Sequence, residues 1–189
     1  MKRAAFVGSS LAMVAAAFLR NVSLAAETGA AGLELTVLVE TLLPFGSPAF
    51  PAIPSTAVVQ RIEGLFKLGE SQVFQASLRG FSALALFSTG DDQLFAAERA
   101  VSPESNPRDL VRRDAAAFAA TGLSLAANFQ DLTPEGKSQY VRLWSQSAFS
   151  VRRRFYGSVR AVTFVALYSL PEAWAAIGYA GPILKGARA

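Results

Sequence analysis

Apolar residues in this 189-residue chain recur at the spacing of an α-helix, and no segment shows the sustained alternation of a half-buried β-strand. In residues 33–43, for example, Leu35, Leu38, Val39 and Leu42 fall on one helical face. Hydrophobic residues make up 52% of the chain and charged residues 17%, which suits a compact core and excludes disorder. The pattern therefore predicts an all-α, single-domain protein of about five to six helices.

Prolines and glycines divide this helical pattern. Residues 44–54 contain four prolines in eleven positions, so they predict a stiff, extended loop after the first helix. The sequence SPESNP at 102–107 predicts a second loop. Between and beyond these loops we expect helices from a capping Ser55 to Gly69, over 70–89, and over 108–128 with a weak point at Gly122.

Two more helices are expected towards the C-terminus. Thr133, Pro134 and Glu135 combine a capping hydroxyl, a proline at the first helical position and an acid in the first turn. The last long helix, over about 150–169, is apolar on every side in its second half except at Thr163. Such a segment predicts a central helix that is covered all round. The adjacent arginines 152–154 are typical of a solvated helix face, with a docking patch as the alternative.

Residues 1–25 have the features of an export signal. Lys2 and Arg3 precede an apolar stretch over 4–19, and residues 23–25 (Ser-Leu-Ala) offer small residues at a signal-peptidase site. The stretch is short for a membrane-spanning helix. We therefore expect a cleaved signal peptide, of the twin-arginine or the general secretory type, with an uncleaved anchor as the alternative. Because Lys2, Arg3 and Arg20 supply most of the +4 net charge, no binding to nucleic acid is expected.

The chain lacks the residues that bind most metals. It contains no His and no Cys, and its two Met residues, Met1 and Met13, lie in the predicted signal. Haem, iron–sulfur, copper and most zinc sites draw on these residue types, and the common serine and cysteine hydrolases need a His base. The sequence also has no Gly-rich nucleotide loop. We expect no metal, cofactor or catalytic residue in this chain.

The segments 38–54, 129–147, 152–174 and 177–182 resemble, in order and spacing, the gluconate 2-dehydrogenase subunit 3 family. The resemblance covers about residues 33–183, and Gly178-Tyr179 with Gly181-Pro182 is its most distinctive element. It implies a helical small-subunit domain over 33–183, between the signal at 1–25 and a tail at 184–189.

Members of this family are small exported subunits that accompany flavin-containing dehydrogenases of the glucose–methanol–choline class. The resemblance therefore implies a periplasmic, non-catalytic accessory subunit that aids the folding, export or stability of a large flavoprotein. FAD is expected in that partner subunit, and a c-type cytochrome is a candidate third subunit. Attachment to the membrane would then come through the complex.

Residues that contact the partner are expected in three places: the proline-rich loop, the adjacent arginines 152–154 and the aromatic tail. The candidates are Pro44, Phe45, Phe50, Pro51, Arg153, Trp174, Tyr179, Gly181 and Pro182. Aromatic and Arg side chains are enriched where interfaces are strongest, and a stiff loop loses little entropy on docking. The structural alternatives are a core position for Trp174 and a simple turn at 178–182.

Two other functions stay open. The chain could be a stand-alone binding module that holds a lipid or another apolar ligand between its helices. It could also be a small hydrolase or isomerase that uses the carboxylates of Asp91 and Asp92, although adjacent acids in a loop are poorly placed for paired acid–base catalysis. A neighbouring gene for a large flavin oxidoreductase would separate these functions from the accessory subunit.

Overall fold

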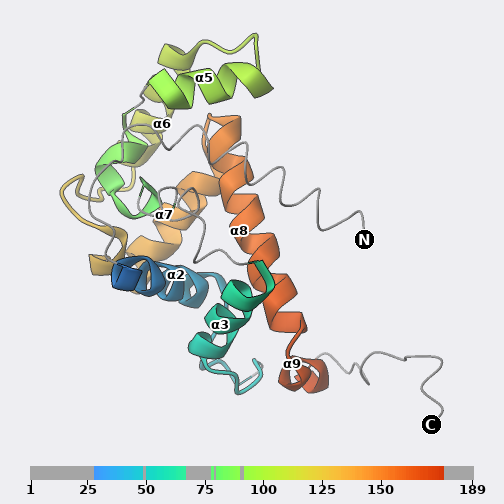
Figure 1. The fold of residues 1–189 in the computed structure, drawn as a ribbon. Coiled ribbons are helices and arrows are strands. Elements are labelled where there is room, and N and C mark those ends of the chain that lie inside the picture. Colours follow the sequence, from blue (N-terminus) through green and yellow to red (C-terminus); the bar gives the residue numbers. More distant parts are fainter. Residues whose placement is uncertain (1–27, 49, 67–77, 79, 90–91, 177–189) are drawn as a thin grey trace.

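The computed structural model describes residues 28–48, 50–66, 78, 80–89 and 92–176, and their regular structure is helical (Figure 1). This confirms the predicted all-α class. The α-helices of the described residues are α2 (Thr28–Leu42), α3 (Ser55–Phe66), α5 (Asp92–Val101), α6 (Pro107–Ala119), α7 (Pro134–Gln146), α8 (Ser150–Tyr168) and α9 (Pro171–Ala176). Two short 3₁₀ helices accompany them, η2 (Leu84–Phe87) and η3 (Phe129–Asp131).

Helix α8 packs against most of the other helices, which in Figure 1 lie to its left and at its two ends. It packs against α3, α5 and α7, and α9 follows at its C-terminal end, while α2 packs against α3 and α7. The buried face of α8 explains this position. Val151, Phe155, Val159, Val162 and Ala166 recur every three or four residues, so they form one continuous apolar stripe for the neighbouring helices.

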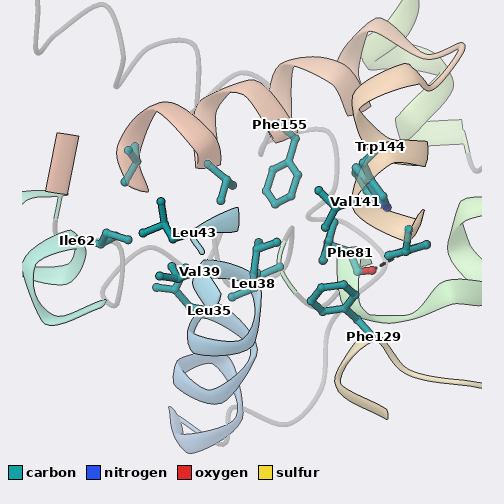
Figure 2. Packing of buried hydrophobic residues seen from close by; sticks show 14 of the residues in the cluster. Leu35, Leu38, Val39, Leu43, Ile62, Phe81, Phe129, Val141, Trp144 and Phe155 are labelled. Atoms are coloured by element: carbon teal, nitrogen blue, oxygen red, sulfur yellow. Dashed lines mark hydrogen bonds between the residues drawn. The ribbon is translucent and has the colours of Figure 1, made fainter. Parts of the chain in front are cut away.

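Aromatic rings fill the space between α7, α8 and η3. Phe81 lies at their centre, with ring centroids 4.8 Å from Phe129, 5.3 Å from Tyr140, 5.1 Å from Trp144 and 6.2 Å from Phe155. Figure 2 shows Phe81, Phe129, Trp144 and Phe155 on one side of the core and Leu35 and Leu38 of α2 on the other. Rings at these separations and tilts add favourable edge-to-face contacts to the burial of their large apolar surfaces. Contacts among these aromatic side chains therefore fill this part of the core.

Local capping chemistry sets the start of α7, as predicted. The Thr133 hydroxyl accepts a hydrogen bond from the Gly136 amide at 3.1 Å, and proline occupies the first helical position. Ser55 behaves differently from the prediction, because it is the first residue of α3 and not its cap. Its hydroxyl donates to Glu40 Oε1 at 2.6 Å and so ties α3 to α2.

The helix predicted over 70–89 does not reach its expected end. The described backbone is helical up to Ser82, but Ala83 is extended, with φ −86° and ψ 101°, and η2 follows. Ala83 pairs with Asn128 in an isolated antiparallel bridge. Phe81, before this break, and Phe87, after it, are both buried. The sequence spacing did suit a helix, and the prediction is wrong because a contact with a distant segment determines the backbone at Ala83.

Two further helix boundaries differ from the prediction. The helix expected over 108–128 ends at Ala119, and Gly122 then adopts a φ of 70°, which favours glycine. A helix at 92–101 was not predicted. This segment, α5, has an acid in its first turn and Arg99 in its last, the arrangement that complements a helix dipole.

Candidate partner interface

The three adjacent arginines do not share a solvated face, so that prediction is wrong for one of them. Arg152 is only 1% exposed, whereas Arg153 and Arg154 are exposed. Successive side chains on a helix project about 100° apart, so three adjacent residues cannot all point to one side. Arg152 turns inward to Asp114 of α6, while its two neighbours turn outward.

Arg152 is held by a carboxylate and by backbone carbonyls. Its Nη1 donates to Asp114 Oδ2 at 2.6 Å and to the Phe87 carbonyl at 2.7 Å. Its Nη2 donates to the carbonyls of Leu86 and Thr89, both at 2.9 Å. These carbonyls belong to the last two residues of η2 and to Thr89, which lies just after it. The C-terminal end of η2 and the residues after it thus supply the acceptors that a buried guanidinium requires.

Asp114 completes this buried arginine cluster, which we define as Arg152, Asp114 and Ser147. Besides the arginine, the Asp114 carboxylate accepts hydrogen bonds from the Ser147 hydroxyl and from the Ala148 amide at 2.6 Å. The guanidinium also lies over the Phe87 ring, at 4.7 Å from its centroid. Ser147 is 2% exposed, so its hydroxyl is enclosed in the core. The cluster joins α6, α8, η2 and the residue that follows α7.

A second buried carboxylate caps α8. Glu98 of α5, 1% exposed, accepts hydrogen bonds from the amides of Ser150 and Val151, both at 3.0 Å. Helix α8 has no side-chain cap at Phe149 and no acid in its own first turn. Glu98 therefore replaces the missing local cap and places a negative charge at the positive end of the helix. Sequence reasoning missed this residue, because nothing in α8 or α5 links them before the chain folds.

The proline-rich loop is partly built into the domain. Phe45 and Phe50 are half-buried and contact each other edge to face, with centroids 5.1 Å apart. Ile53, in the same loop, is buried. Pro44 is exposed and Pro51 is half-buried, so part of the loop surface stays open. Contact between this loop and a partner remains a prediction.

The other predicted contact residues lie at separate places. Arg153, at the start of α8, donates to the carbonyls of Ser147 and Ala148, the latter at 3.0 Å. Trp174 lies on α9, beyond the other end of α8, where its Nε1 donates to the Tyr168 carbonyl at 2.8 Å. The structure therefore does not bring Arg153 and Trp174 together. The remaining candidates, Tyr179, Gly181 and Pro182, lie outside the described residues.

The second half of α8 is not covered all round, which corrects the prediction for 161–168. One side is buried, with Thr163 fully so, but Val165 is 53% exposed and Tyr168 46%. We call the exposed side the outer face of α8: its apolar residues are Gly157, Ala161, Phe164, Val165 and Tyr168, of which Phe164 is half-buried, and Arg153, Arg154 and Arg160 are exposed beside them. Helix α8 thus carries its core stripe on one side, while apolar residues and arginines share the other side.

Two structural features, a metal-binding cluster and a membrane-spanning helix, are absent from the described residues. In this part of the chain, no group of three or more His, Cys, Asp or Glu side chains is placed to hold a metal ion. None of its helices combines the length and the apolar character that a membrane crossing requires. Asp92 is exposed in the first turn of α5, and its neighbour Asp91 lies outside the described residues. No family model, curated protein or solved structure matches this chain.

Proposed function

We propose that this protein is the non-catalytic small subunit of an exported complex whose large subunit is a flavin-dependent sugar or alcohol dehydrogenase. The observation that carries the proposal is the outer face of α8, where Val165 and Tyr168 are both exposed beside other apolar residues of the same helix. Contiguous exposed apolar surface marks contacts with other proteins. The resemblance of 129–147 and 152–174, which contain α7 and most of α8, to gluconate 2-dehydrogenase subunit 3 supplies the partner's identity.

In this proposal the two subunits divide the work. The large subunit binds FAD and oxidises the substrate, and a c-type cytochrome is a candidate acceptor subunit. The small chain contributes a rigid surface, which aids the folding, stability or export of the flavoprotein. The signal at 1–25 directs it to the periplasm. The proline-rich loop and the tail after α9 are further candidate contacts.

Purification from the periplasm of the native host tests the proposal. A tagged chain should co-purify with a flavoprotein of the glucose–methanol–choline class in equimolar amount, together with dehydrogenase activity towards an artificial acceptor. The chain separated from this partner should be colourless and inactive. An unrelated exported protein with the same tag is the control. Recovery of the chain without a flavoprotein, or turnover of sugars or alcohols by the chain alone, would contradict the proposal.

A further inference from the structure

The outer face of α8 has the shape of a surface that receives another segment. Gly157, Ala161 and Val165 are four residues apart, so they lie in one row along the helix, and Tyr168 continues it. A Cβ placed on Gly157 would meet nothing within 4 Å, so the surface there is open. Small residues at two successive turns let a partner backbone approach closely, while the larger side chains further along provide apolar contact.

Aromatic side chains form the C-terminal end of this face and contact one another there. Phe164 and Tyr168 stack with centroids 6.1 Å apart, and the Arg160 guanidinium lies 5.6 Å from the centroid of Phe164. Trp174 donates to the Tyr168 carbonyl, which holds α9 beside the same end of α8. These contacts restrict the side chains of Phe164 and Trp174, so less side-chain entropy is lost when a partner binds.

Most of the charged side chains around the face are arginines. Helix α8 contains four arginines and no acidic residue, and three of these arginines, Arg153, Arg154 and Arg160, are exposed. Arg61 of α3 adds a further positive charge, and its Nε donates to Ser169 Oγ at 2.7 Å. Two exposed acids, Glu63 of α3 and Glu172 of α9, add negative charge. An occupant with carboxylates around an apolar centre would therefore complement this face.

The same charges weigh against two other occupants. The segment 177–189 of this chain contains Lys185 and Arg188 and no acid, so it would bring positive charge to a positive surface. A second copy of the chain would place two arginine-bearing, acid-free α8 helices against each other. In both cases like charges would be brought together as the apolar groups are buried, which costs free energy.

We propose that the outer face of α8 docks an apolar segment of a different protein that is flanked by Asp or Glu residues. The location and chemistry of this surface come from α8 and the residues beside it, and only the naming of the partner as the large flavoprotein rests on the proposed function. The surface also differs from the one that the sequence predicted, because it lies on the face of a helix and not in the proline-rich loop. Among the predicted contacts that the structure describes, Trp174 and Arg153 lie beside it.

Photo-crosslinking in the native host tests the proposal. A photoreactive amino acid replaces Val165 in the full chain, and the cross-linked peptide is identified by mass spectrometry. The matched control carries it at Leu125, which is 49% exposed, close to the 53% of Val165, but lies in the loop between α6 and η3. We expect a cross-link from position 165, and none from 125, to an apolar peptide of another protein with flanking Asp or Glu.

The identity of the cross-linked protein separates the two proposals. If it is the flavoprotein, both stand; if it is another protein with such a peptide, the docking surface stands and the proposed function fails. Cross-links to a second copy or to 177–189, equal cross-linking from both positions, or none from position 165 would overturn the docking surface.

Substitutions then test the chemistry of the face in the purified complex. Val165→Asp and Arg160→Glu should each weaken binding of the cross-linked partner by about tenfold or more, because both place negative charge against the expected carboxylates. Leu125→Asp and Arg113→Glu, at exposed positions on other elements, are the matched controls and should leave binding unchanged. Thermal unfolding of each variant shows that the fold is intact. Binding that tolerates Val165→Asp and Arg160→Glu would overturn the proposal.

Discussion

Replacing Asp114 with Asn examines how much the buried arginine cluster contributes to stability. The substitution keeps the size and shape of the side chain but removes the charge that faces Arg152 at 2.6 Å. It also exchanges one acceptor oxygen for a donor NH₂ group, which then meets donors, because Arg152, Ser147 and the Ala148 amide all donate to this carboxylate. The side chains of the ion pair are only 2% and 3% exposed, so water cannot take over the lost contacts.

The structure sets the expected size of the effect. Removing one partner of a buried ion pair destabilises a protein by about 3–5 kcal/mol. Arg152 keeps its three carbonyl acceptors in the variant, so we expect the lower end, about 3 kcal/mol. For a domain of this size such a loss lowers the midpoint of thermal unfolding by about 6–12 °C.

The control for this prediction lies on the same helix. Asp109 pairs with Arg112 at 3.1 Å, but their side chains are 52% and 81% exposed, so Asp109→Asn should change stability by less than about 1 kcal/mol. Thermal and urea unfolding of both variants, followed by circular dichroism, give the comparison. If Asp114→Asn destabilises the protein no more than Asp109→Asn does, the buried pair does not hold these helices together.

Three more results are expected. Burial raises the pKa of the Tyr140 hydroxyl. The free energy of unfolding should therefore fall above about pH 10, where the unfolded chain releases a proton that the folded chain keeps. Unfolding measured at several pH values should show a weaker decline in the Tyr140→Phe variant. Glu98→Ala should lower the free energy of urea unfolding by about 1–3 kcal/mol, because it leaves two amides at the start of α8 without their acceptor. The control Glu104→Ala, in an exposed loop, should leave this free energy unchanged. Intact mass measurement of the periplasmic protein should show that residues 1–25 are absent, and a soluble chain that begins at Met1 would contradict the predicted cleavage.

Several features of the fold follow from local sequence alone. The apolar spacing fixes the helical class, and Thr133 with Pro134 fixes where α7 begins, because a hydroxyl cap and a proline act on backbone groups within one turn. The bounds of α8, Ser150–Tyr168, match the predicted 150–169 because the apolar repeat runs through the whole segment. These predictions hold because the interactions that decide them join residues three or four positions apart.

The tertiary structure decided the features that depend on distant contacts. Ala83 leaves the helix to pair with Asn128, Arg152 is buried because Asp114 and the carbonyls of η2 surround it, and Glu98 caps a helix 52 residues away. The apolar spacing of 161–168 was consistent with full burial, yet which side of α8 stays open depends on where α3, α7 and α9 pack. A sequence pattern shows which surface a helix can bury, but the number and placement of its neighbours determine how much of that surface is covered.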